Sequence, residues 1–87
     1  MNTCYALSWT EYERGWGQRP DGVTLCATKA IAEARYNAAF TNRGGSTPDE
    51  YSNPSEPYLV EVTSAAYKLI QQVGARWFTP SDRSWRV

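Results

Sequence analysis

Residues 3–27 read TCYALSWTEYERGWGQRPDGVTLCA and contain two stretches with the period of a β-strand. In residues 3–10 large and small side chains alternate, and the same alternation returns at residues 23–27. Arg-Pro-Asp-Gly at 19–22 has the composition of a turn, because proline presets φ and glycine accepts positive φ. The pattern predicts two antiparallel strands joined by a loop over residues 11–22, the head of a long hairpin.

Two later stretches have the composition and spacing of helices. Thr28 is a candidate N-cap for an Ala-rich run without Gly or Pro, and Gly44-Gly45 ends that helical region. Ser64 is a candidate N-cap for a second helix, in which apolar residues recur at helical spacing. Gly74 provides its C-terminal stop.

The remaining segments complete the predicted architecture. Residues 43–57, rich in Pro, Gly and Ser, predict an extended loop, and a strand follows at 58–63. A short final strand at 76–79 is left open, and residues 80–87 form a C-terminal tail. The order β-β-α-β-α predicts a single α+β domain over residues 1–87, a small antiparallel sheet with both helices packed on one face.

Length and charge limit the classes of function. Eighty-seven residues provide one small core, so a homo-oligomer that adds stability stays open. Nine basic and nine acidic residues cancel, and we therefore do not expect non-specific binding to nucleic acid. The sequence has neither an apolar run long enough to span a membrane nor the pattern of a signal peptide. We expect a cytoplasmic protein without membrane contact.

The titratable residues favour binding over catalysis. The chain has no histidine, which removes the commonest general base and the usual zinc ligand sets. Cys4 and Cys26 match no metal or redox spacing; we expect reduced core thiols, with a bridge as the alternative if both lie on paired strands. An enzyme would have to rely on Glu11, Glu13 or Tyr12, and the two glutamates are better interpreted as solvated or paired with neighbouring arginines. We predict no catalytic residue, metal or cofactor.

The hairpin head contains a concentrated set of recognition side chains. Trp16 stands between Gly15 and Gly17, and Arg14 and Arg19 flank this triplet. The glycines leave the backbone free and place no side chain beside the indole. The indole therefore either folds back over the sheet as a plug or stays exposed for a partner, and the sequence leaves both alternatives open.

Three segments carry a resemblance to known sequences. EYERGWGQRPDG at residues 11–22, DEYS at 49–52 and EPY at 56–58 resemble segments of a group of small bacteriophage-encoded proteins. The resemblance implies a phage accessory protein in the host cytoplasm. Such proteins act on host defence or host metabolism by binding rather than by chemistry.

These observations lead to one hypothesis, a phage-type counter-defence protein that sequesters a small nucleotide-like immune signalling molecule. Aromatic rings would stack on a base and guanidinium groups would hold phosphate. The candidate ligand-binding residues are Tyr12, Arg14, Trp16, Arg19, Arg43 and Tyr51. The alternative is an anti-CRISPR-like protein–protein inhibitor of a host defence complex, with Trp85 and Arg86 as partner-binding residues.

Overall fold

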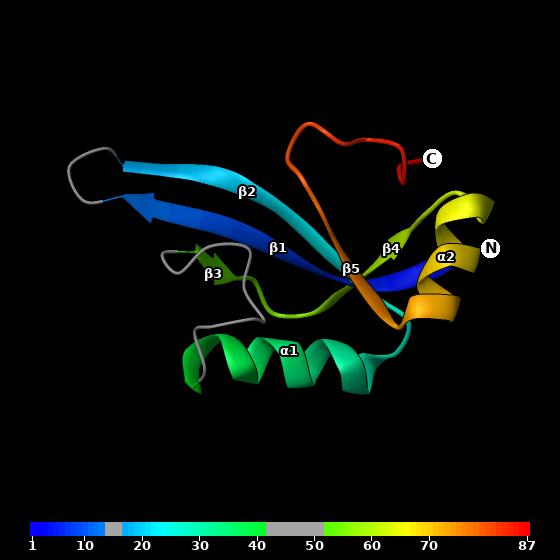
Figure 1. Cartoon of the computed structure of the whole chain (residues 1–87), viewed down its shortest axis with the longest axis horizontal. Coiled ribbons are helices and arrows are strands. Elements are labelled where there is room, and N and C mark those ends of the chain that lie inside the picture. The colour runs from blue at the N-terminus through cyan, green and yellow to red at the C-terminus, as the bar shows by residue number, and fades with distance from the viewer. Residues whose placement is uncertain (14–16, 42–51) are drawn as a thin grey trace.

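The computed structural model describes residues 1–13, 17–41 and 52–87. They form one antiparallel sheet and two helices (Figure 1). In chain order the elements are β1 (Thr3–Glu13), β2 (Gly17–Cys26), α1 (Lys29–Thr41), β3 (Ser52–Pro54), β4 (Tyr58–Glu61), α2 (Ser64–Val73) and β5 (Ala75–Phe78). The predicted α+β class is confirmed, with the final strand present. The short strand β3 was not predicted and lies inside the expected loop.

The long hairpin is confirmed, but its strands reach further than the alternation predicted. β1 pairs with β2 from Tyr5 opposite Cys26 to Glu13 opposite Gly17. Residues 19–22 therefore lie inside β2, and their interpretation as a turn is wrong. The connection between the strands falls in residues 14–16, outside the described residues.

A β-bulge explains why turn chemistry occurs within β2. Ser8 faces Val23 and Thr10 faces Pro20, so two residues of β2 lie opposite a single residue of β1. The extra residue is accommodated by Gly22, whose φ is +87°. Positive φ is the conformation that glycine accepts without a steric penalty, so the glycine that suggests a turn instead permits the bulge.

The bulge also links β2 to strands on both sides of the hairpin. The carbonyl oxygen of Asp21 accepts a hydrogen bond from Trp77 Nε1 of β5 at 2.9 Å. The Asp21 carboxylate accepts one from the hydroxyl of Ser52, a fully buried residue of β3. Asp21 thus joins β2 to both β5 and β3, two strands that are distant from it in sequence.

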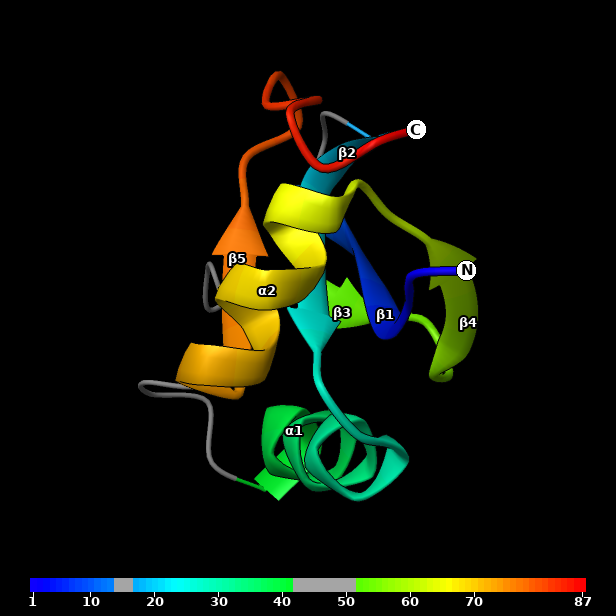
Figure 2. The ribbon, with the colours of Figure 1, turned by 90° about the vertical axis from the view of Figure 1, so that its right-hand side faces the viewer.

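The two helices lie on opposite faces of the sheet, which differs from the expected packing on one face (Figure 2). The strands are ordered β3-β1-β2-β5, and β4 also pairs with β1. Ala6 and Leu25 lie opposite each other and join Ile70 of α2 in one core cluster. Leu7 and Trp9, which point the other way along β1, pack with Ala39 of α1. The physical reason is that β1 has apolar side chains on both of its faces, and each face is covered by its own helix.

The helix ends follow ordinary capping chemistry. Thr28 Oγ1 accepts a hydrogen bond from the backbone nitrogen of Ile31 at 3.2 Å, as expected of the predicted cap of α1. For α2 the N-cap is Thr63 rather than the predicted Ser64, because Thr63 is extended and its hydroxyl accepts from the nitrogen of Ala66. Gly74 ends α2 as predicted, at a φ of 88°. Neither described helix is long and apolar enough to cross a bilayer.

Trp9 is the largest side chain in the fully buried core, and it lies in the stretch 3–10 where large and small side chains alternate. Its indole Nε1 donates to Thr24 Oγ1 at 2.8 Å. Thr24 lies on the neighbouring strand and is also buried. This bond satisfies an indole N–H that has been removed from water, which is the usual requirement for burying tryptophan.

We expect Gly22→Ala to destabilise the fold much more than Gly17→Ala. Both glycines have positive φ, but a Cβ at Gly22 would overlap the carbonyl oxygen of Phe78 and lie 2.7 Å from Trp77 Nε1. A Cβ at Gly17 has nothing within 4 Å. Gly17→Ala should therefore cost only the backbone strain of about 1–2 kcal/mol, whereas Gly22→Ala should also displace β5. Chemical denaturation of both variants measures this, and equal losses would contradict it.

We expect Thr24→Val to cost about 1–3 kcal/mol of unfolding free energy, because it leaves the Trp9 N–H buried without an acceptor. In a Trp9→Phe background the same substitution should cost much less, since the donor is already gone. A double-mutant cycle by urea denaturation measures this coupling. Additive losses would show that the bond contributes no net stability.

Candidate ligand-binding groove

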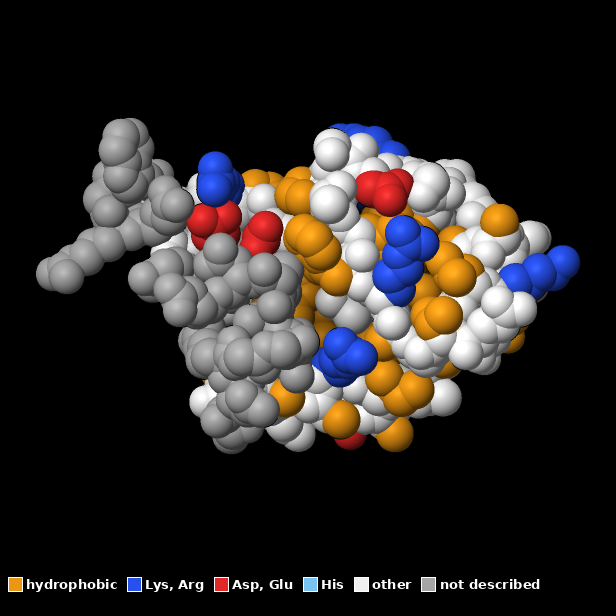
Figure 3. Space-filling model, in the orientation of Figure 1, with side chains coloured by type: hydrophobic (Ala, Val, Ile, Leu, Met, Phe, Trp, Pro, Cys, Tyr) orange, Lys and Arg blue, Asp and Glu red, His pale blue; other side chains and the backbone are white. Residues whose placement is uncertain are grey.

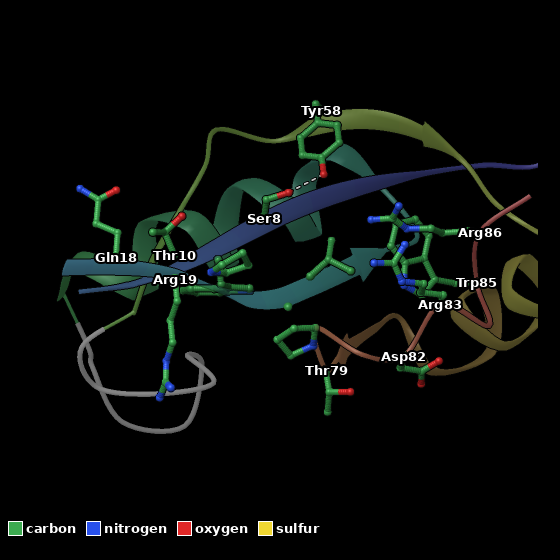
Figure 4. Close-up of a pocket in the computed structure, with 15 residues that line it drawn as sticks. Ser8, Thr10, Gln18, Arg19, Tyr58, Thr79, Asp82, Arg83, Trp85 and Arg86 are labelled. Atoms are coloured by element: carbon green, nitrogen blue, oxygen red, sulfur yellow. Dashed lines mark hydrogen bonds between the residues drawn. The ribbon is translucent and has the colours of Figure 1, made fainter. Parts of the chain in front are cut away.

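A groove of about 600 Å³ lies on the face of the sheet that carries α2. Its floor comes from β1 and β2, where Ser8, Pro20 and Val23 line it. Tyr58 of β4 lines it as well, and residues of the C-terminal segment 79–86 contribute a wall (Figure 4). We call this space the sheet groove. It has an apolar floor with polar side chains around it, the composition of many small-molecule sites.

The C-terminal wall is fixed to the domain by Trp85. Its indole is 7% exposed and packs in the core against Phe78, with ring centroids 6.4 Å apart. Its carbonyl oxygen accepts a hydrogen bond from the backbone nitrogen of Thr63 at 3.0 Å, and Arg86 forms an isolated β-bridge with Val62. The expected C-terminal tail is therefore docked onto its own domain.

A tight turn shapes the wall just before Trp85. The Asp82 Oδ1 atom accepts hydrogen bonds from the backbone nitrogen of Ser84 at 3.0 Å and from its hydroxyl at 2.6 Å. These hydrogen bonds hold the pKa of Asp82 below its ordinary value of 3.8, and the charge of Arg76 adds a smaller effect in the same direction. The carboxylate therefore stabilises the turn in its ionised form.

Positive charge exceeds negative charge around the groove. Arg83 and Arg86 line it, while Asp82 is its one carboxylate among the described lining residues; Arg19 also lines it, but its guanidinium is paired with Glu11. Figure 4 shows Arg83 and Arg86 together at one end, apart from Arg19. On the visible described surface, basic side chains are otherwise dispersed among apolar and uncharged ones (Figure 3). The arrangement suits a small anion better than a long polyanion, which needs a continuous basic surface.

Arg19 is held in place by Glu11. Arg19 Nε lies 3.0 Å from Glu11 Oε2, and Arg19 Nη2 lies 3.2 Å from Oε1, a bidentate pair. The Glu11 side chain is buried, whereas the Arg19 side chain is largely exposed. This confirms the interpretation of Glu11 as the partner of a neighbouring arginine and leaves it unsuited to acid–base catalysis.

A hydroxyl pair joins two of the lining residues, Ser8 of β1 and Tyr58 of β4. The Ser8 and Tyr58 hydroxyls are hydrogen-bonded to each other across β1 and β4 (Figure 4). The backbone of Ser8 is fixed independently, since its nitrogen donates to Ser55 Oγ at 3.0 Å. Tyr58 is 40% exposed, so its ring presents an accessible aromatic surface at this point.

The predicted site residues fall into three groups. Arg19, Trp85 and Arg86 line the groove. Tyr12 is exposed near the far end of β1 and is not part of the groove. The others lie outside the described residues; they are Arg14, Trp16, Arg43 and Tyr51. The question of whether Trp16 is a plug or exposed therefore stays open.

Sequence reasoning missed Ser8, Tyr58 and Arg83 as groove residues. Tyr58 and Ser8 belong to different strands 50 positions apart, and only strand pairing brings their hydroxyls together. Arg83 had a local signal, since it lies three residues before Arg86 with Trp85 between them. In a turn or a helix, residues three positions apart lie on the same side of the chain. The spacing of Arg83 and Arg86 could therefore have identified the tail as a candidate site.

The cysteines and metal ligands support no reactive centre in the described structure. Cys4 and Cys26 are buried and free, as predicted; they lie on paired strands but point to opposite faces of the sheet. Burial raises the pKa of Cys26 to about 11, against a smaller opposing effect of Arg35, and so keeps it a thiol. No cluster of three or more potential metal ligands occurs within 1–13, 17–41 and 52–87.

Comparison with known proteins adds no assignment. No protein-family model, curated protein or solved structure matches the chain. The groove itself is therefore the basis for a proposed function.

We expect Asp82→Ala to lower the melting temperature at neutral pH, with an effect that disappears in acid. Because the folded pKa of Asp82 is depressed, its stabilisation is present above the ordinary value of 3.8 and is lost as the pH falls through the lower folded value. Melting curves of both proteins from about pH 7 to about pH 2 measure the difference. A constant difference across this range would contradict a role for the ionised carboxylate.

Proposed function

We propose that this chain is a noncovalent binder of a small, nucleotide-like anion, which it holds in the sheet groove. The supporting observation is the combination of an apolar floor, an exposed aromatic ring at Tyr58 and an excess of arginine over carboxylate around one 600 Å³ space. Such a space fits a ligand with a planar ring and a negatively charged group. In a phage setting, as the resemblance of residues 11–22 implies, the role would be counter-defence, with the protein sequestering an immune signalling molecule.

The chemistry of the groove favours capture over conversion of the ligand. Its carboxylate at Asp82 is engaged by Ser84, and the chain has no histidine to act as a general base. The remaining groups are hydrogen-bond donors, hydroxyls and an aromatic ring. These groups bind and orient a ligand without providing an evident nucleophile–base pair.

The direct test is calorimetry and thermal shift of the purified chain with cyclic dinucleotides, ADP-ribose derivatives and nucleoside monophosphates. We expect at least one of these compounds to raise the melting temperature and to bind more weakly as salt increases, because exposed charges are screened. The matching unphosphorylated nucleosides serve as controls. Flat responses to the whole set would overturn the proposal.

A matched pair of variants tests the location. Tyr58 and Leu59 are adjacent exposed residues of β4 that point to opposite faces of the sheet, and only Tyr58 lines the groove. Tyr58→Ala should weaken binding roughly fivefold or more, since stacking of an aromatic ring on a base is worth about 1–3 kcal/mol. Leu59→Ala should bind like the parent protein. Equal affinities for both variants would place the ligand elsewhere.

A protein–protein inhibitor is the second candidate function, and the edge of the sheet favours it. β5 is the last strand in the order β3-β1-β2-β5 and has no further strand beside it among the described residues. A partner could add a strand at this edge, next to Trp77, which is 39% exposed. Pull-down from infected host lysate would detect a stoichiometric protein partner, whereas a small molecule released on heating would favour the nucleotide binder.

A further inference from the structure

The indole N–H of Trp85 is a donor without an acceptor. Trp85 lines the sheet groove, its side chain is more than nine-tenths buried, and its Nε1 atom has no hydrogen-bond partner. The other indole of the core differs, because Trp9 Nε1 donates to Thr24. A buried donor left unpaired carries a desolvation cost of about 1–3 kcal/mol. A ligand acceptor that reached Nε1 would recover this cost.

Two guanidinium groups lie at the same end of the groove. The backbone nitrogen of Arg86 donates to the carbonyl oxygen of Arg83 at 3.1 Å, so one turn brings the two residues together. The Arg86 guanidinium carbon lies 5.1 Å from the centroid of the Trp85 ring. Figure 4 shows both guanidinium groups beside Trp85. Neither arginine takes part in an ion pair in the described parts of the chain.

The nearby carboxylate does not neutralise this end. Asp82 directs its Oδ1 atom to the backbone and hydroxyl of Ser84. The charge that affects its pKa is that of Arg76, on β5, rather than that of either groove arginine. Within the described residues, neither guanidinium therefore has a carboxylate partner, and the buried Trp85 N–H beside them has no acceptor.

From this arrangement we infer that Trp85 Nε1, Arg83 and Arg86 form a phosphate subsite that takes a terminal phosphomonoester. Three separate donor groups match an anion with three terminal oxygens, arranged as a tetrahedron. A carboxylate or a phosphodiester offers only two terminal oxygens. The inference refines the proposed function, on which it rests, by selecting ligands with an end phosphate over cyclic ones.

Ligand preference is the first test. We compare a nucleoside 5′-monophosphate with the 3′,5′-cyclic monophosphate of the same nucleoside by calorimetry, using the full chain. The 5′-monophosphate should bind at least about tenfold more tightly, the contribution expected of one charge-assisted hydrogen bond. Arg83→Gln and Arg86→Gln should each remove most of this preference. Arg76→Gln, which alters an arginine outside the groove, should retain it.

The indole itself gives a readout that needs no destabilising variant. In protein labelled with ¹⁵N at tryptophan, the Trp85 Nε1–H resonance should shift on titration with inorganic phosphate or with the monophosphate. That of Trp9, already bonded to Thr24, should stay in place. Trp85→Phe assigns the resonance; if that variant does not fold, Trp9→Phe, Trp16→Phe and Trp77→Phe assign the other three of the four indole resonances, and Trp85 follows by elimination.

The outcomes separate the subsite from the function it rests on. A Trp85 shift with inorganic phosphate, without binding of any nucleotide, would support the subsite and reject the nucleotide binder. Nucleotide binding that leaves the Trp85 resonance and the arginine variants unchanged would overturn the subsite while the groove function stands. Equal affinity for the cyclic and 5′-monophosphates would also overturn it.

Discussion

Trp77 Nε1 donates a hydrogen bond to the carbonyl oxygen of Asp21, and this contact depends on a β-bulge that only Gly22 permits. At the bulge β5 lies so close to β2 that a side chain at position 22 has no room. The Asp21 carboxylate reaches the other way, to Ser52 of β3. One irregularity in the central hairpin therefore helps to position both outer strands. Strand β2 contributes Gly22 and Val23 to the groove, and β5 leads directly into its C-terminal wall.

A small domain has few ways to bury enough apolar surface, and this one uses both faces of the same strand. Along β1, Ala6 packs towards α2 while Leu7 and Trp9 pack towards α1. Full burial of each large side chain contributes about 1.5–3 kcal/mol. The two clusters thus share the central hairpin, which makes its register decisive, because a shift by one residue would exchange the faces.

The sheet groove exists because α2 covers only part of its face. Beyond the helix the face is bordered by the segment 79–86, which is anchored by Trp85 in the same core cluster as Ile70. Trp85 therefore combines two features: its ring contributes to the core, and its buried N–H has no hydrogen-bond partner. The proposed phosphate subsite therefore shares a side chain with the anchor of the segment 79–86, and under this proposal ligand binding and docking of the segment support each other.

The sequence by itself determined the elements whose signals are local. Alternation identified the hairpin and the burial of Trp9, and glycine at 74 marked the end of α2, because strand period and positive φ are properties of neighbouring residues. The α+β class and the free, buried state of Cys4 and Cys26 also followed from the sequence. Arg19, Trp85 and Arg86, which the sequence suggested as members of two different sites, line one groove.

Tertiary structure alone decided what depends on pairing between distant segments. Whether Asp21-Gly22 forms a turn or a bulge depends on how many residues of β1 lie opposite these two residues. The local sequence motif does not specify this pairing. The two helices lie on opposite faces of the sheet because α2 packs on the face that carries Ala6, and α1 packs on the face that carries Leu7 and Trp9. The meeting of Ser8 with Tyr58, and of the C-terminal arginines with β2, needs the complete strand order. Local chemistry suggested Arg19, Trp85 and Arg86 as candidates, and the long-range register of the sheet placed these three around one groove.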